Sequence, residues 1–308
     1  MKPLYTGKAL SLDEIIGMLK NQGLTIEDEE KARHILTNIS YSRFKAYLVP
    51  LMEDRSTHRF KQGATFGQAH AYYGFDRRFR ELVFHELEKV EISIRTRIAY
   101  AVNGSENGYW FTNPDHFRNY SSHRHLLDGI KRDVERSDVD AIRSFRKKYS
   151  NEFPPSWLTM EATSMGTLSM IYDEMKPGPI RDRIAAYYGV DDLTFASWLR
   201  HIVYIRNICA HHGRLWNHTL TVQARIPAKP RKLFPRVKPE MTSNIYYTLC
   251  VIQYIQNTVK PDNSFAVRLK GLIDNFPLIG TKELASMGFP TNWEKDEFWS
   301  KALKQALT

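Results

Sequence analysis

Cysteine and long apolar runs are both scarce in this 308-residue sequence, and each shortage excludes a class of protein. The two cysteines, Cys209 and Cys250, are too few for a disulfide framework, and both lie in apolar helical patterns that are typical of buried thiols in a reducing cytoplasm. No run reaches the ~18 apolar residues that a membrane-spanning helix needs, and the N-terminus lacks the apolar segment of a signal peptide. We therefore expect a cytoplasmic protein with no membrane partner.

Acidic residues are missing from one long stretch. No Asp or Glu occurs between Leu193 and Pro239, although Lys and Arg recur through it and the whole chain carries a net charge of +10. An acid-free basic segment suits a polyanion site, because each Lys or Arg near a phosphate releases counterions. The alternative is an ordinary solvated basic face. We favour contact with phosphate groups or nucleic acid.

The apolar pattern is helical almost throughout, and no period-2 run that would indicate a strand persists. The clearest helix runs from Phe75 to about residue 102, where apolar residues recur at steps of three and four and where Asp76/Arg80 and Glu91/Arg95 form i,i+4 pairs. The sequence therefore predicts an all-α fold. Further helices are expected after the capping box SLDE (11–14), from residue 41, and over about 26–39, 121–149, 155–172, 192–210, 245–259 and 265–272.

The segment RNICAHHGRLWN (206–217) closes the apolar helix predicted over 192–210. On a continuous helix, Asn207 and His211 share a face, whereas Arg206 and His211 lie ~140° apart. We expect Gly213 to end the helix near residues 210–212. Such an end frees the two histidines to turn, and it leaves them where the helix dipole favours positive charge.

An Arg, a polar neighbour and a His suit metal-free cleavage of RNA. The imidazole can take the proton from a ribose 2′-OH or give one to the leaving 5′-oxygen, while the guanidinium holds the non-bridging phosphate oxygens. DNA lacks the 2′-OH, so this chemistry specifies RNA. Since one Arg and one His are few groups for the reaction, we expect a symmetric homodimer that brings two copies together. The candidate catalytic residues are Arg206, Asn207, His211 and His212, and no cofactor is expected.

Basic residues outside this group are candidates for RNA binding. Residues 227–239 hold four prolines and five basic side chains, so we expect an extended connector that lies beside the motif. Arg77 belongs to the long helix, where a solvated helix face is the alternative. The RNA-binding candidates are Arg77, Arg214, Lys229, Arg231, Lys232 and Arg236.

Spacing alone does not single out the motif, because an Arg followed five residues later by a His occurs three times. One pair lies inside the long helix, where we interpret it as a surface pair, and another lies in a polar segment. Only the third combines an apolar helix, an adjacent Asn, a following Gly and acid-free surroundings. The three pairs are Arg80/His85, Arg118/His123 and Arg206/His211.

Two other interpretations of the histidines stay open. In a structural interpretation, the His pair caps the helix end and bonds backbone carbonyls. In a metal-site interpretation, neighbouring His and Cys side chains hold zinc, but no His-x-x-x-His or paired-Cys spacing supports this, and we expect no metal. The residues it would draw on are His201, Cys209, His211, His212 and His218.

Four blocks of the sequence resemble the Abi-like proteins, the AbiD/AbiF type of bacterial abortive-infection family. The blocks occur in the expected order, and together they span roughly residues 10–260. They are ISYSRFKAYLVPL (39–51), FGQAHAYYGFDRRFRELVFHELEKVEISIRTRIAY (66–100), PPSWLTMEATSMGTLSMIY (154–172) and RNICAHHGRLWN (206–217).

The resemblance implies a HEPN-type helical bundle with additional N-terminal and C-terminal helices, and a role in antiphage defence. We accordingly divide the chain into an N-terminal helical region (1–60), a HEPN-like core that carries the motif (61–260) and a C-terminal extension (261–308). In that superfamily an Arg-(x4–6)-His motif is the ribonuclease centre, usually built from two HEPN domains, and type VI CRISPR effectors are similar. Arg206 and His211 match the motif, and Asn207 matches its polar second position. His212 also fits the spacing, but we prefer His211 as the acid or base because it shares a helix face with Asn207.

The same resemblance implies further roles and a second kind of function. Some members work with a small noncoding RNA, which makes a non-catalytic RNA-binding scaffold the alternative to a metal-independent endoribonuclease. A third interpretation is a protein–protein regulator in a toxin–antitoxin pair. Residues that match the family outside the Arg–His pair are Trp157, Glu161 and Gly166, expected to pack and position helices, and Arg214, Trp216 and Asn217, whose roles stay open.

Overall fold

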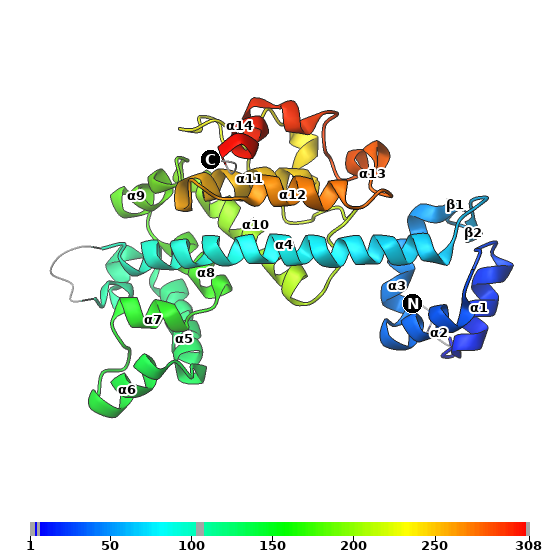
Figure 1. Ribbon diagram of the computed structural model, residues 1–308. Coiled ribbons are helices and arrows are strands. Elements are labelled where there is room, and N and C mark those ends of the chain that lie inside the picture. Colours follow the sequence, from blue (N-terminus) through cyan, green and yellow to red (C-terminus); the bar gives the residue numbers. More distant parts are fainter. Residues whose placement is uncertain (1–3, 5–6, 103–107, 306–308) are drawn as a thin grey trace.

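One long helix, α4 (Phe66–Ala99), is the axis on which the other elements pack (Figure 1). The computed structural model describes residues 4, 7–102 and 108–305. Thr65 and Gln68 start α4 as a capping box: the Thr65 hydroxyl accepts from the Gln68 N–H at 3.1 Å, and the Gln68 side chain accepts from the Thr65 N–H at 3.0 Å. The sequence predicted this helix only from Phe75, and the capping box explains its earlier start.

The N-terminal elements gather at one end of α4 (Figure 1). The third helix packs on α4, where Phe44 stacks on Phe66 with ring centroids 4.7 Å apart. A short antiparallel hairpin follows, and its strands are too short to show a period-2 pattern in the sequence. The elements are α1 (Leu12–Asn21), which begins with the predicted capping box, α2 (Glu29–Asn38), α3 (Tyr41–Leu48), a 3-10 turn (Val49–Leu51), β1 (Met52–Asp54) and β2 (Arg59–Phe60).

The other end of α4 carries helices from the middle of the chain (Figure 1). The sequence predicted one helix over 155–172, but the structure has two, because Ser164 starts a new one. Its hydroxyl accepts from the Thr167 N–H at 3.1 Å, and its own N–H donates to the Asp133 carboxylate at 3.1 Å. The elements are two 3-10 turns (Trp110–Thr112 and Pro114–His116), α5 (Tyr120–Arg136), α6 (Asp140–Lys148), α7 (Ser156–Ala162) and α8 (Met165–Glu174).

Helix α10 (Asp192–Ala210) packs on both α4 and α8 and has the bounds that the sequence predicted. A short helix, α9 (Pro179–Tyr187), precedes it and was not predicted, since it has too few apolar residues to show a stripe. After α10 the chain stays without an α-helix as far as a 3-10 turn at Pro239–Ser243, as expected for the proline-rich connector.

The C-terminal helices lie on the side of α4 away from α5–α7 (Figure 1). A buried carboxylate of α4 helps to fasten them: Glu86 accepts from Gln256 of α11 at 2.8 Å and pairs with Arg268 of α12. The carboxylate is fully buried, and Lys89 of α4 also donates to it at 3.1 Å, so its charge is compensated by two cations. The elements are α11 (Ile245–Val259), α12 (Phe265–Asp274), α13 (Thr281–Ser286), a 3-10 turn (Trp293–Lys295) and α14 (Glu297–Gln305).

The structure confirms the all-α fold class, with the β1–β2 hairpin as a small addition. Both cysteines are buried and unpaired, as the sequence predicted. Across residues 4, 7–102 and 108–305, no helix combines the length and the apolar character needed to cross a membrane.

Candidate functional site

The C-terminal end of α10 turns sharply at the two histidines. The His212 N–H donates to the Cys209 carbonyl at 3.1 Å, and the Gly213 N–H donates to the Ile208 carbonyl at 2.8 Å, which is the bond pattern of a Schellman cap. The helix therefore ends at Ala210, where the sequence predicted. The left-handed residue is His212, with φ of 56°, and not the glycine that we expected there.

Gly213 is needed at this turn for a different reason from the one predicted. A Cβ on Gly213 would lie 3.2 Å from the Ile208 Cγ2 and 3.3 Å from the Ile208 carbonyl oxygen. Those contacts are tighter than van der Waals packing allows without a shift. The glycine thus lets the chain pass close to the last turn of α10, while His212 takes the strained conformation.

The segment after the histidines is anchored to α4 by a buried carboxylate. Asp76 accepts from the Leu215 N–H at 3.0 Å and from the Trp216 N–H at 2.6 Å, and it also pairs with Arg80. The Trp216 ring stacks on Tyr72 with centroids 4.5 Å apart. Leu215 and Trp216 of the motif therefore have a structural role, which gives Trp216 the function that its match to the family left open.

The interpretation of Arg80/His85 as a surface pair is wrong. Arg80 is only 6% exposed and faces Asp76 inside the molecule, whereas His85 is exposed. The sequence pattern missed this because an i,i+4 Asp–Arg pair looks the same on a buried and on a solvated helix face.

Helix α3 holds the same turn from the other side. Arg43 donates to the His212 carbonyl, and Arg214 Nη1 lies 3.5 Å from the Ala46 carbonyl oxygen. The backbone carbonyl of the left-handed residue thus has a side-chain partner outside its own helix. The turn is clamped between α3 and α4, so the two histidines project from a fixed base and not from a loose loop.

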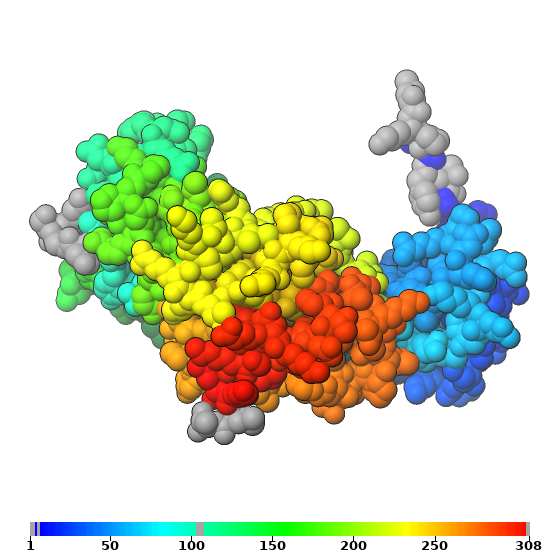
Figure 2. Space-filling model, turned by 90° about the horizontal axis from the view of Figure 1, so that it is seen from above, coloured from blue at the N-terminus to red at the C-terminus, as the bar shows by residue number. Residues whose placement is uncertain are grey.

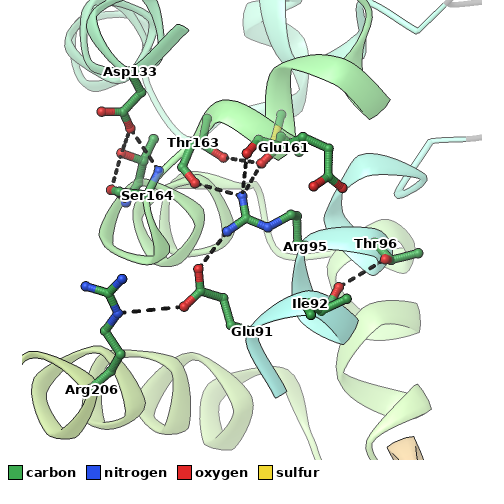
Figure 3. A network of polar contacts seen from close by, with 11 residues as sticks. Glu91, Ile92, Arg95, Thr96, Asp133, Glu161, Thr163, Ser164 and Arg206 are labelled. Carbon is green, nitrogen blue, oxygen red and sulfur yellow. Dashed lines mark hydrogen bonds and ion pairs between the residues drawn. The ribbon is translucent and has the colours of Figure 1, made fainter. Parts of the chain in front are cut away.

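Arg206 is half-buried on α10 and faces α4 (Figure 3). Its Nε lies 3.8 Å from Glu91 Oε2, and its guanidinium carbon is 5.9 Å from the centre of the Phe84 ring. The other Glu91 oxygen accepts from Arg95 Nη2 at 2.6 Å. Arg95 in turn donates to the Thr163 carbonyl at 2.8 Å, beyond the last turn of α7.

A continuous polar chain therefore links the motif arginine to α7 (Figure 3). Arg95 also lies 3.3 Å from the carbonyl oxygen of Glu161, one of the residues expected to position helices. Trp157 packs over Gly108, where a Cβ would come within 2.5 Å of the indole ring. Gly166 has only the Ser164 hydroxyl near it, at 3.6 Å from an added Cβ, so nothing in its surroundings requires glycine.

The motif lies in an acid-free segment of the sequence, but carboxylates from another segment lie near it in the folded protein. Helix α4 brings Glu91 against Arg206, and Glu81 lines a pocket next to the histidines. Both carboxylates come from a segment far from the motif in the sequence, so the local composition could not reveal them.

A pocket of about 310 Å³ lies between α4 and the end of α10. Its lining includes His212 and Arg77, which was predicted to bind RNA. It also includes Phe84, which the apolar pattern of the sequence did not single out. Asn207 and His211 are exposed and do not line the pocket. The lining residues are Arg77, Arg80, Glu81, Phe84, Cys209, Ala210 and His212.

The side chains considered for a zinc site do not converge. His201 is fully buried, and both ring nitrogens are engaged, with Nδ1 2.6 Å from the Val222 carbonyl oxygen and Nε2 2.8 Å from the Thr248 hydroxyl. Burial raises the pKa of the Cys209 thiol to about 12, which keeps it protonated. Over the described part of the chain, no group of three or more His, Cys, Asp or Glu side chains is placed to hold a metal ion.

The basic connector does not lie beside the histidines. After the motif the chain runs back along α10, with Trp198 donating to the Arg225 carbonyl at 2.8 Å and the Arg231 N–H donating to the Gly189 carbonyl at 2.9 Å. At about 1.5 Å of rise per residue, the start of α10 is roughly 30 Å from His211. The connector covers the surface between the middle helices and the C-terminal helices (Figure 2, yellow).

The structure therefore separates the predicted RNA-binding residues into two groups. Arg77 lines the pocket, and Arg214 belongs to the clamped turn. The others are exposed along the connector, and Lys232 donates to the Thr258 hydroxyl at 2.6 Å. This second group consists of Lys229, Arg231, Lys232 and Arg236.

Comparison with known proteins gives one match. The family model described as Abi-like protein matches residues 34–217, which is more than half of the chain. The matched range runs from α2 through the clamped turn and ends on Asn217, the last residue of the motif. No curated protein and no solved structure matches the chain.

Proposed function

Because the chain belongs to the Abi-like protein family, we propose that this protein of abortive-infection defence is a dimeric, metal-independent endoribonuclease of HEPN type. The observation that supports the proposal most directly is the placement of Arg206. Its Nε faces Glu91 while its terminal nitrogens point away from that carboxylate (Figure 3), which leaves them to donate to a phosphate.

The proposed reaction is transfer of the phosphoryl group to the neighbouring 2′-oxygen. The base takes the 2′-OH proton, the 2′-oxygen bonds to phosphorus, and the 5′-oxygen leaves with a proton from the acid. Arg206 stabilises the charge that builds on the non-bridging oxygens. The products carry 2′,3′-cyclic phosphate and 5′-OH ends.

Each of the two histidines is a candidate for the proton transfers, and the two have different surroundings. His211 is exposed beside Asn207, four residues along the same helix, whereas His212 lines the pocket together with Phe84. One copy of the motif supplies one Arg and two adjacent, diverging histidines. A homodimer would supply the second set of groups for the acid and base steps.

RNA is the proposed substrate and partner, bound by two basic groups. Arg77 and Arg214 would contact the strand at the motif, and the connector residues would contact phosphates farther along α10. Their placement supports a strand that follows α10 over several nucleotides. The connector residues are Lys229, Arg231, Lys232 and Arg236.

A non-catalytic RNA-binding scaffold is the second candidate. The observation that favours it is the pairing of Arg206 with Glu91, because this carboxylate neutralises part of the charge that phosphate stabilisation would use. A scaffold would bind RNA through the same basic residues without cutting it. A regulator of a toxin–antitoxin pair would show no dependence on RNA.

Cleavage of a labelled mixed RNA pool in excess EDTA tests the proposal. We expect the wild type to cut. Arg206→Ala should lose at least about 100-fold in rate, the usual contribution of a group that stabilises charge in the transition state. One of His211→Ala and His212→Ala should lose a similar factor, the usual contribution of a general acid or base. His85→Ala is the matched control, since His85 is an exposed histidine with the same spacing from an arginine.

Each other outcome has a definite meaning. If the wild type binds RNA but leaves it intact, the scaffold takes the place of the enzyme. Equal cutting by all variants would contradict the assignment of the site. Loss of cutting in His85→Ala as well would show that the motif histidines have no special role.

A further inference from the structure

Phe84 is a large apolar side chain on the exposed face of α4, where Glu81, His85 and Glu88 are also exposed. Its neighbour Val83 is fully buried and Leu87 is 1% exposed, yet Phe84 is 40% exposed. On the facing end of α10, the small side chain of Ala210 and the left-handed turn at His212 leave the pocket next to Phe84 open. An aromatic ring therefore forms part of a pocket that this chain does not fill.

The pocket combines apolar side chains with an excess of positive charge, because Arg77 and Arg80 outnumber the one carboxylate in the lining, Glu81. Arg206 lies with its guanidinium carbon 5.9 Å from the centre of the Phe84 ring, and exposed Arg77 lines the opposite end of the pocket with His212. Helices α4 and α10 run antiparallel here, because Arg206 meets Glu91 whereas Cys209 and Ala210 meet the segment near Arg77. A flat apolar group that carries an anionic substituent is complementary to such a pocket.

We propose that the pocket takes one unpaired nucleobase of an RNA strand, stacked on Phe84. The inference rests on the proposed function in that the ligand is RNA. Single-stranded bases are commonly bound by stacking on an aromatic side chain, and their phosphates by nearby arginines. An apolar side chain of a partner protein would fill the same space but would not use the terminal nitrogens of the two arginines. Arg77 faces Glu81 at 3.9 Å and Arg206 faces Glu91 at 3.8 Å, in each case with Nε as the nearest atom, so the other nitrogens can still donate to a phosphate.

The base pocket has a consequence for the substrate. A base held on Phe84 is out of a duplex, so the strand must be unpaired at that nucleotide. Its phosphate would then lie within reach of Arg206, which places the bound nucleotide next to the bond to be cut. Phe84 would fix the register of the strand without taking part in proton transfer.

Binding of short 2′-O-methyl RNA tests the proposal independently of cleavage, because this RNA has no free 2′-OH to attack. A series of oligonucleotides, each abasic at one position, is titrated against the full-length protein. We expect wild-type affinity to fall by about 5- to 100-fold at one abasic position, the usual range for a base stacked on an aromatic side chain. Phe84→Ala should bind the intact strand as weakly as the wild type binds that abasic strand. Its affinity should be the same for the intact strand and for the abasic strand.

Two variants make the test specific. Phe84→Tyr keeps a stacking ring and should keep the wild-type pattern. Ile92→Ala is the control, since Ile92 is an apolar residue of α4 that is 56% exposed and does not line the pocket. Circular dichroism checks that all variants fold, and sedimentation reports their oligomeric state.

The proposal fails if no abasic position weakens wild-type binding, or if Phe84→Ala responds to the same position as the wild type. It also fails if Phe84→Ala and Ile92→Ala both dissociate a dimer, because the face is then a protein interface. An abasic effect without cleavage would keep the base pocket and reject the ribonuclease. Cleavage without an abasic effect would support the ribonuclease and reject the base pocket.

Discussion

His212 has a left-handed backbone conformation that residues other than Gly and Asn rarely adopt. Its φ of 56° costs on the order of 1 kcal/mol relative to an ordinary conformation. Two backbone bonds and Arg43 hold the residue in place, so the surrounding structure maintains the strain. A glycine would fit this position without strain, and the presence of a histidine is consistent with a role for its side chain in the pocket.

Glu91 is the residue that sets the position of Arg206, and we predict that Glu91→Gln lowers cleavage more than binding. The change removes the carboxylate that faces Arg206 Nε and that also pairs with Arg95. We expect kcat to fall about 10-fold or more because the guanidinium loses its fixed geometry. RNA affinity should stay equal or increase, since one negative charge near the phosphate is gone.

Single-turnover kinetics together with a binding titration separate the two effects. Glu88→Gln is the matched control, because Glu88 is an exposed acid of the same helix and its loss changes the net charge by the same amount. If Glu88→Gln reduces kcat as much as Glu91→Gln does, the effect comes from net charge and the positioning role is wrong.

Among the elements, α10 was the most predictable from the sequence. The segments that pack around it were the least predictable. The apolar seam and the glycine after the histidines determine where the helix lies and where it ends. The path of the connector depends on contacts such as Trp198 with the Arg225 carbonyl, which join residues far apart in the sequence. No local pattern encodes such a pairing, so the basic residues could not be placed along α10 from the sequence.

His201 joins α10 to α11 and to the segment that precedes the connector, and we predict that it makes the protein sensitive to acid. Burial lowers the pKa of His201 from 6.5 to about 4. The unfolded chain therefore binds this proton first, and the free energy of unfolding falls as the pH drops from 6.5 toward 4. At pH 5 this one group should lower the free energy of unfolding by about 2 kcal/mol relative to pH 7.5.

Urea unfolding of the wild type and of His201→Gln at both pH values measures this contribution. The variant should be less stable at pH 7.5, because the bonds to Val222 and Thr248 are disturbed, but its stability should fall by about 2 kcal/mol less on going to pH 5. An equal fall in the two proteins would show that other groups cause the acid sensitivity.

For the whole molecule, the candidate site is built from three segments that lie far apart in the sequence. The turn at His212 depends on Arg43 from α3, on Asp76 from α4 and on the stacking of Trp216. The sequence identified the motif because its residue types suggest a reaction. It could not identify the supporting residues, because a buried Asp–Arg pair and an exposed Phe are recognised only once the helices are packed.

The proposed dimeric centre makes a prediction about mixed assemblies. If each active centre needs the motif of both copies, a dimer of one wild-type copy and one Arg206→Ala copy is inactive, since one phosphate-binding guanidinium is missing. With equal amounts and random pairing, about one quarter of the dimers are then fully wild type. We expect RNA cleavage at about one quarter of the value for the same total amount of wild-type protein, falling as the square of the wild-type fraction.

Co-expression of two differently tagged copies, followed by purification of all dimers together, gives the required mixtures. Cleavage is measured at several ratios, and the tags report how much mixed dimer forms. A linear dependence, with about one half of the activity at equal amounts, would show that one copy holds a complete centre. In that case Arg206 and a histidine of the same chain must act together, and the clamped turn would have to bring His212 toward Arg206 across the pocket that they border.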